Sequence, residues 1–485
     1  MKAYQSLCFF CAILMLIVGL CYFFPEDGVV VCGKTFDFPT LEEAMTKKEK
    51  DTESADEKLA KAEAEMKLQI LNDSLAKVRK AEEADSLAYV DTLKSYENLL
   101  YKSMARIVFP NNDVSKMYKF FDLLDKCAKG TESLHILHYG DSQIEQDRIT
   151  GYIRERLQQR FGGWGAGMVP AIQPIPASDS LPRYIADGTM RQKLSHNRYG
   201  VLAQMANLNG SITLYYSARD WKKTYPRAKK FSKVSLFVGN THENFSATLS
   251  YDDIDTTQII AEANSDMSVL TWQLPHDIRK FSLRLKGKAE IYGVNMSGKS
   301  GVSMSNIPLR GSSGTFFTRI SSQLLSKSMK ALNTRLVIME FGGNATPYLD
   351  SDEGVEHYKN SISRQIAYVK KAYPQALLLL IGPADMSTMI AGERQTYPFL
   401  ETTIEALQEA AMENDAMFWN MYEVMGGRNS MLKWVEHEPK WAATDYVHFT
   451  ETGAKRIAEV FVQSFLNTYD YYHFLKRNKK WSGVE

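Results

Sequence analysis

Cysteine is scarce in this chain, with five among 485 residues. Cys8, Cys11 and Cys21 fall within an apolar N-terminal run, where a cysteine need only be a small hydrophobic residue. Only Cys32 and Cys127 lie beyond that run, so a disulfide between them stays open, but two cysteines make no disulfide framework. No spacing of cysteine and histidine fits a metal site, and we therefore expect no metal.

An excess of charge of either sign is also lacking. The 58 basic and 57 acidic side chains leave a formal net charge of +1. This balance gives no overall field that would steer the chain to nucleic acid, and we expect no nucleic-acid partner. The hydrophobic share of 44% and the charged share of 24% are those of a globular protein. The length predicts two or three folded units.

Charged side chains are absent from the apolar run over residues 7–24. At about 1.5 Å per residue, such a run is close to long enough to span a bilayer. No convincing small-residue cleavage site follows it, and the residues before Cys21 fit a lipoprotein cleavage box poorly. We predict an uncleaved signal anchor over residues 1–30, which leaves Lys2 inside and the rest of the chain on the periplasmic side of the cell membrane. A cleaved signal peptide and a lipoprotein are the alternatives.

Glycine and proline are missing between Leu41 and Lys102. That stretch is rich in Ala, Glu, Lys and Leu, and its apolar side chains recur at helical spacing. It predicts a solvated, coiled-coil-like helical stalk over residues 31–105. The apolar seam is irregular, so a partner-binding coiled coil is the alternative, and an oligomer formed through the stalk is left open.

Short apolar strands alternate with helical segments in the rest of the chain. We predict strands at about 134–138, 335–341, 376–381 and 416–421, and helices at about 143–161, 353–373, 399–414 and 453–475. This alternation predicts an α/β domain with a mostly parallel sheet covered on both faces, split into residues 106–194 and 293–485. Period-2 runs over residues 195–292 predict a β-sandwich inserted between the two parts.

A Gly-Asp-Ser motif ending at Ser142 follows the first predicted strand. A strand-to-helix junction places side chains at the carboxyl end of the sheet, where open α/β folds bind their ligands. A serine hydroxyl becomes a nucleophile when a base takes its proton, and a backbone amide there can donate to an oxyanion. Taken alone, the motif is explained as well by a helix N-cap at Ser142.

Two further motifs supply the other groups that such chemistry needs. Gly-Gly-Asn ends at Asn344, after a second buried strand, and an asparagine side chain is a known type of oxyanion donor. Asp445 and His448 stand three residues apart before the last predicted helix, where a turn can bring carboxylate and imidazole together. Taken alone, these motifs are a turn and a surface loop.

Together, the order Ser, Asn, Asp-x-x-His resembles that of the SGNH/GDSL hydrolase family. The resemblance implies a three-layer, flavodoxin-like domain with a catalytic triad of Ser142, Asp445 and His448. It also implies an oxyanion hole formed by Ser142, Gly311 and Asn344. Gly311 is our choice for the family's central glycine because it follows a strand between the Ser and Asn motifs. No metal or cofactor is needed for this chemistry.

The predicted insertion makes the chain most like bacterial peptidoglycan O-acetylesterases, which carry a carbohydrate-binding-like β-sandwich inside an SGNH domain. The likeness spans about residues 133–474. Many SGNH enzymes have Asp after the Asn, where this chain has Ala345. This departure concerns the resemblance to a particular subfamily and not the triad.

This resemblance implies a serine esterase that removes O-acetyl groups from a cell-envelope glycan, peptidoglycan first. The alternatives are a glycan O-acetyltransferase with the same triad, an acetyl esterase on other polysaccharides such as xylan, and a non-catalytic glycan-binding envelope protein. Weaker candidates for sugar contacts are Trp164, Tyr215 and Trp221.

Overall fold

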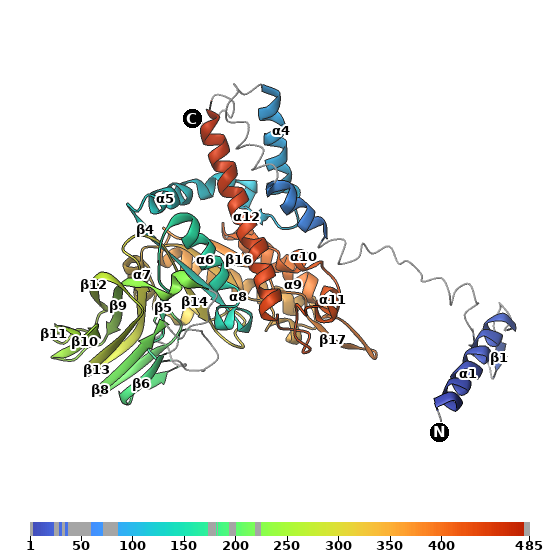
Figure 1. Ribbon diagram of the computed structural model, residues 1–485, viewed down its shortest axis with the longest axis horizontal. Helices are drawn as coiled ribbons and strands as arrows, with labels where there is room; N and C mark the ends of the chain where they lie inside the picture. The colour runs from blue at the N-terminus through green and yellow to red at the C-terminus, as the bar shows by residue number, and fades with distance from the viewer. Residues whose placement is uncertain are drawn as a thin grey trace. The chain divides into compact units, whose positions relative to one another are not determined.

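The computed structural model describes residues 3–23, 29–31, 34–36, 60–70, 86–172, 181, 183–193, 200–218 and 225–479. The chain divides into two compact units, Met1–Ser54 and Ala55–Glu485. In the first unit, helix α1 (Ala3–Phe23) is followed by an antiparallel pair of short strands, β1 (Val29–Val31) and β2 (Lys34–Phe36). The rest of the structure belongs to the second unit (Figure 1).

Helix α1 coincides with the apolar run from which we predicted a membrane anchor. Among the described residues, however, no helix is both long and apolar enough to cross a membrane. The predicted single-pass anchor, and the cell-membrane localisation that depends on it, are therefore wrong.

The predicted stalk is described only in part, as a helix over 60–70 and as α4 (Ser86–Glu97), which continues into the π-helical turn η1 (Asn98–Lys102). Tyr89 and Tyr96 of α4 pack on Phe474 of the C-terminal helix α12 (Glu451–Arg477), with ring centroids 5.1 and 5.3 Å from that of Phe474. Figure 1 shows the two helices side by side. The aromatic face of α4 is thus buried within its own chain, and the coiled-coil-like stalk stays a prediction.

A six-stranded sheet organises the second unit, in the order β14-β4-β15-β16-β19-β3. Neighbouring strands are parallel except for the edge strand β3, which pairs antiparallel to β19. This confirms the mostly parallel sheet. The strands are β3 (Ile107–Val108), β4 (Ser133–Gly140), β14 (Gly301–Pro308), β15 (Thr334–Glu340), β16 (Leu377–Ile381) and β19 (Met417–Trp419).

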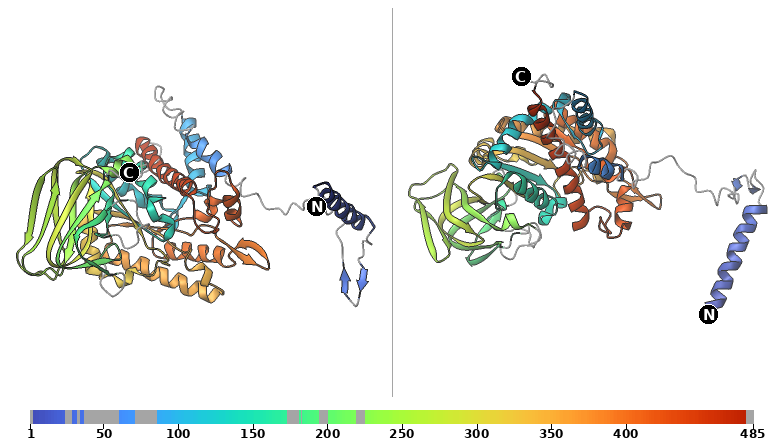
Figure 2. Two further views of the ribbon diagram at one scale, coloured as in Figure 1. Left: turned by 60° about the horizontal axis from the view of Figure 1, so that its bottom comes forward. Right: turned by 45° about the horizontal axis from the view of Figure 1, so that its top comes forward.

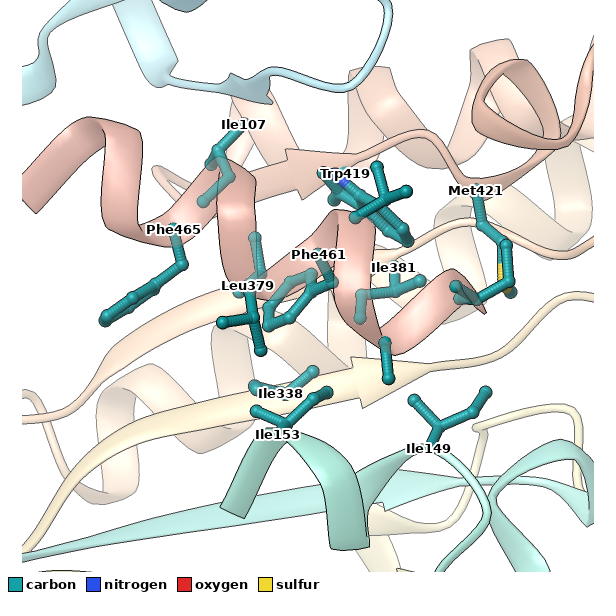
Figure 3. Packing of buried hydrophobic residues seen from close by; sticks show 14 of the residues in the cluster. Ile107, Ile149, Ile153, Ile338, Leu379, Ile381, Trp419, Met421, Phe461 and Phe465 are labelled. Carbon is teal, nitrogen blue, oxygen red and sulfur yellow. The ribbon is translucent and has the colours of Figure 1, made fainter. Parts of the chain in front are cut away.

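Helices cover both faces of this sheet. Successive side chains of a strand point to opposite faces, so a strand that is apolar throughout needs a hydrophobic core on each side. In β15, Leu336 and Ile338 join one hydrophobic core, whereas Val337 and Met339 join the other. The first core, part of which Figure 3 shows, includes α5 (Tyr118–Ala128), α6 (Thr150–Phe161) and α12. The second includes α7 (Ser322–Leu332), α8 (Asp352–Ala372) and α9 (Leu400–Glu413). The layers are those of a three-layer α/β domain.

The helix predicted over 143–161 is interrupted. Its first part is the 3-10 segment η4 (Ser142–Asp147), in which Gln146 and Asp147 have φ of 57° and 59°, and α6 begins only at Thr150. The kink lets the carboxylate of Asp147 accept a hydrogen bond from Arg154 at 2.5 Å, with both residues at most 2% exposed. A buried charge needs such a partner. The stabilisation that this ion pair supplies outweighs the helical hydrogen bonds that are lost at the kink.

A second, antiparallel sheet of nine strands lies beside the helix-covered sheet (Figure 2, green to yellow). Its long strand β13 pairs with β8, β9, β10 and β5, and the sheet encloses a hydrophobic core of its own. The strands form one continuous sheet that begins before residue 195, so the β-sandwich over 195–292 stays a prediction. They are β5 (Gly167–Val169), β6 (Arg183–Gly188), β7 (Arg191–Lys193), β8 (Met205–Ser217), β9 (Phe231–Gly239), β10 (Phe245–Tyr251), β11 (Ile254–Ile260), β12 (Ser268–Ile278) and β13 (Lys280–Ser297).

Smaller elements complete the unit. They include a hairpin of β17 (Ser387–Ile390) and β18 (Glu393–Thr396), and the short helices α10 (Met421–Met425) and α11 (Ser430–Glu436). Cys127, at the end of α5, is a buried free thiol. Cys32, with which a disulfide was left open, lies outside the described residues.

Candidate active site

The predicted chemical groups gather at the carboxyl ends of the parallel strands. Ser142 follows β4, Gly311 follows β14 and Asn344 follows β15. His448 comes from the far end of the chain, in the loop before α12. The hydroxyl of Thr450 accepts a hydrogen bond from the Gly453 N–H at 3.2 Å, and this cap fixes the start of α12 just beyond His448.

Three side chains form a continuous chain of hydrogen bonds at this edge. Ser142 Oγ lies 2.7 Å from His448 Nε2, and His448 Nδ1 lies 2.7 Å from Asp445 Oδ2. An ionised carboxylate only accepts, so the contact with Asp445 puts the imidazole proton on Nδ1. Nε2 is then free to accept the Ser142 proton, which is the arrangement that an activated serine requires.

The environment of Asp445 keeps its carboxylate ionised. Partial burial alone would raise its pKa, but hydrogen bonds from the backbone N–H and the ring of His448 and from the backbone N–H of Val447 outweigh that effect and lower the pKa. Both backbone donors lie 3.0 Å from Oδ1, which leaves Oδ2 for the ring. The carboxylate can thus hold His448 in a single tautomer.

Gln143, directly after the serine, fastens the loop that carries His448. Its amide Nε2 donates to the Val447 carbonyl at 2.6 Å, and its Oε1 accepts from the Phe449 N–H at 3.2 Å. The guanidinium of Arg148 adds a second tie, because it donates to the Phe449 carbonyl at 2.9 Å and also to the Ser142 carbonyl. The turn that carries Ser142 and the loop that carries His448 are thereby held in a fixed relative position.

The predicted oxyanion donors lie near the serine. Asn344 Nδ2 donates to Asp141 Oδ2 at 2.9 Å and, over a longer 3.3 Å, to the Ser312 carbonyl. Gly311 has a φ of +74°, which favours glycine, in a turn closed by a 2.9 Å hydrogen bond from the Ser312 N–H to the Leu309 carbonyl.

Ser142, His448, Gly311 and Asn344 all line one pocket with a volume of about 600 Å³. Its other walls mix charged, aromatic and apolar side chains, among them Arg310, Tyr348, Met386 and Tyr397. Within the described residues, no group of three or more His, Cys, Asp or Glu side chains is arranged to hold a metal ion. The pocket therefore combines a serine hydroxyl, an imidazole and hydrogen-bond donors.

Comparison with solved structures decides the fold. A peptidoglycan O-acetylesterase matches with a TM-score of 0.61 and 21% identity, over 74% of this chain and 98% of that one. The chain shares the fold of that protein. Two more distant structures are a family two carbohydrate esterase from Cellvibrio japonicus (TM-score 0.25, 9% identity, 60% of this chain and 99% of that one) and a carbohydrate acetylesterase from Sinorhizobium meliloti (TM-score 0.25, 14% identity, 34% and 78%). No family model and no curated protein sequence matches the chain.

The three weaker candidates for sugar contacts either do not line the pocket of Ser142 and His448 or lie outside the described residues. Trp164 is half-buried near the opposite ends of β4 and β14, in a groove with Gly130 and Ser300, and the Arg227 guanidinium lies 4.5 Å from its ring centroid. Tyr215 lies on β8 of the second sheet. Trp221 is not among the described residues.

A buried polar network beneath Ser142 was not predicted from the sequence. Thr150 Oγ1 donates to Asn306 Oδ1 at 2.8 Å, and Asn306 Nδ2 donates to the Ile144 carbonyl in η4 at 3.0 Å. The Thr150 hydroxyl has then used its proton, so it must accept from His138 Nδ1, 2.9 Å away. Glu340 Oε2 lies 3.1 Å from His138 Nε2, the other ring nitrogen. This network supports the turn that carries Ser142.

Proposed function

We propose that this chain is a serine esterase that removes O-acetyl groups from a glycan of the cell envelope, with peptidoglycan as the first candidate. The observation that carries the proposal is the unbroken hydrogen-bonded chain from Ser142 through His448 to Asp445, at the edge of a pocket that can admit an ester. A loop with an incidental Asp and His would not place the imidazole 2.7 Å from a serine hydroxyl on one side and 2.7 Å from a carboxylate on the other.

The first half of the reaction forms an acyl-serine. Ser142 Oγ attacks the acetyl carbonyl carbon while His448 Nε2 takes the serine proton. The tetrahedral intermediate collapses when the bond to the sugar oxygen breaks, and His448 returns its proton to that oxygen. Asp445 remains ionised throughout and stabilises the imidazolium that forms in between.

Negative charge on the carbonyl oxygen is stabilised by donors fixed in advance. The backbone N–H groups of Ser142 and Gly311 and the side chain of Asn344 are the proposed donors. One Asn344 N–H is held by Asp141, which orients the amide. The other has only a long 3.3 Å contact with the Ser312 carbonyl, so it can donate to an oxyanion in place of that acceptor. Charge develops only as the tetrahedral intermediate forms, so this exchange favours the transition state.

The second half of the reaction releases acetate. Water takes the place of the sugar and attacks the acyl carbon while His448 accepts its proton. The bond from that carbon to Ser142 Oγ then breaks, and His448 returns the proton to Oγ. A sugar hydroxyl in place of water would transfer the acetyl group instead. The glycan substrate is supported by the fold shared with a peptidoglycan O-acetylesterase, which covers 98% of that protein.

The experiment is acetate release from O-acetylated peptidoglycan and from acetylated xylan, measured side by side for the wild-type chain and Ser142→Ala. We expect faster release from peptidoglycan and none from the variant. Faster release from xylan would make acetylated xylan, and not peptidoglycan, the preferred substrate. A wild-type chain that releases no acetate from either polymer or from an aryl acetate would refute the esterase activity.

A further inference from the structure

Tyr348 is the most exposed large hydrophobic residue among the described residues of the second unit. It is 84% exposed, whereas the next such residue there, Ile259, reaches 63%. Tyr348 also lines the pocket of Ser142 and His448. An aromatic ring left in water beside a reactive serine is a feature of binding surfaces, because folding alone favours its burial.

The backbone beneath this ring is rigid. Tyr348 ends the 3-10 turn η8 (Thr346–Tyr348), in which its N–H donates to the Ala345 carbonyl at 2.9 Å. Both the N–H and the hydroxyl of Thr346 donate to the Gly342 carbonyl at 3.1 Å, and Thr346 is 1% exposed. Pro347 fixes one more φ angle. The turn follows Asn344 directly, so the ring position is set by the same segment that places the Asn344 amide.

A fixed guanidinium lines the same pocket. Arg310 Nε and Nη2 donate to the two carboxylate oxygens of Glu145 at 2.8 and 2.7 Å. The Glu145 side chain is 8% exposed, whereas that of Arg310 is half exposed. Within the described residues, no partner is recorded for Arg310 Nη1, which can therefore donate to a ligand. A planar donor held in place by a buried carboxylate loses little freedom on binding.

We propose that Tyr348 and Arg310 form a saccharide subsite next to Ser142, an inference that rests on the proposed esterase function. A pyranose ring has an apolar C–H face and a polar rim of hydroxyl and amide oxygens. The face stacks on the Tyr348 ring, and one rim oxygen accepts a hydrogen bond from Arg310 Nη1. The acetyl ester is thus presented through its sugar rather than through its small acyl group. The same contacts add nothing for an acetate ester without a ring.

The test compares two acetate esters, an O-acetylated disaccharide of N-acetylglucosamine and glycerol triacetate, which has no ring. The quantity measured is the ratio of kcat/KM for the disaccharide to kcat/KM for glycerol triacetate. We expect Tyr348→Ala to lower this ratio about tenfold, mainly through KM, because a stacking contact is already made in the ground state. Tyr348→Phe keeps the ring and should stay within about twofold of the wild-type ratio.

Two further variants complete the design. Arg310→Lys keeps a positive charge beside Glu145 but loses the planar fork, and it should lower the same ratio. Met389→Ala, in the β17–β18 hairpin, removes a side chain that is 55% exposed and does not line the pocket, so it should leave the ratio unchanged.

An unchanged ratio in Tyr348→Ala, or an equal loss in Tyr348→Ala and Tyr348→Phe, would overturn the subsite. If the wild-type chain hydrolyses neither ester, the proposed function itself fails, and this outcome is distinct from a missing subsite.

Discussion

At the scale of single residues, Asn344 has two tasks, because its amide bonds Asp141 and is the proposed oxyanion donor. We expect Asn344→Ala to lower kcat for an aryl acetate by roughly 10²–10³ with little change in KM, since the bond to the oxyanion exists only in the transition state. Asn360→Ala, an exposed amide on α8, is the matched control. A variant in which KM alone changed would place Asn344 in substrate binding instead.

Asp141 predicts a pH dependence of stability. Burial raises the pKa of its carboxyl to about 7, with a further rise from Glu340, against hydrogen bonds from Gln143 and Asn344 and the charge of Arg148. In the unfolded chain an aspartate has a pKa of about 3.9. The folded state therefore binds a proton that the unfolded state has released between these two values. The stability that Asp141 contributes is full below about pH 4 and is lost as pH rises through about 7.

Denaturant unfolding of wild-type and Asp141→Asn proteins at several pH values measures this contribution. The free energy of unfolding of the wild type minus that of the variant should fall as pH rises from about 4 to about 7, by a few kcal/mol at most. Asp385, whose pKa burial raises to about 6, is present in both proteins and its effect cancels. A difference that is constant or increases with pH would show that the Asp141 pKa is not raised.

At this scale the sequence indicated Ser142, Asn344, Asp445 and His448 because each stands in a short motif at the end of a strand or before a helix. Ser142, Asn344 and His448 line one pocket, and Asp445 hydrogen-bonds to the His448 ring. Gln143 was within the same motif, but its partners lie about 300 positions further along the chain. Local patterns carry no information on such contacts, so the residues that position the catalytic ones were missed.

At the scale of elements, the two amide bonds of Gln143 join the turn after β4 to the loop before α12. Gln143→Glu keeps the shape and the acceptor, but it loses the donor and places a carboxylate against the Val447 carbonyl. We expect kcat to fall about tenfold to hundredfold with a smaller change in KM, because small displacements of a catalytic group are costly. Gln375→Glu, at an exposed site before β16, is the matched control. An unchanged kcat would show that this tie does not position His448.

Most elements of the α/β domain were predictable from their periodicity. Central parallel strands are buried on both faces and appear as short continuous apolar runs, as in β15 and β16. The interruption between η4 and α6 was not predictable, because it depends on burial of Asp147 against Arg154, and burial depends on the whole fold. The predicted membrane anchor was wrong, because no helix among the described residues is both long and apolar enough to cross a membrane.

At the scale of the whole molecule, the second sheet stands apart from the proposed catalytic residues. Tyr184 on the edge strand β6 is 58% exposed, and its ring centroid lies 5.0 Å from that of Tyr215. Tyr216, the next residue, is 1% exposed and donates to the Ala171 carbonyl, so it belongs to the core. If the sheet binds glycan, Tyr184 and Tyr215 are the residues that we expect to contact it.

We therefore expect the double variant Tyr184→Ala and Tyr215→Ala to weaken acetate release from polymeric substrate several-fold and to leave aryl acetate hydrolysis intact, because a remote contact raises the local concentration of the polymer only. Ile259→Ala, which is exposed on β11, is the control. If the sheet is only a structural brace, both activities should instead decline together with the midpoint of thermal unfolding.

The most direct test of the whole account is the turnover of an aryl acetate by Ser142→Ala. The substitution removes one half-buried hydroxyl and leaves the folded state intact, which circular dichroism can verify. Without the nucleophile no acyl-serine forms, and we expect kcat to fall by more than about 10⁴-fold. A folded variant that kept more than about a hundredth of the wild-type rate would contradict the assignment of Ser142 and, with it, the proposed mechanism.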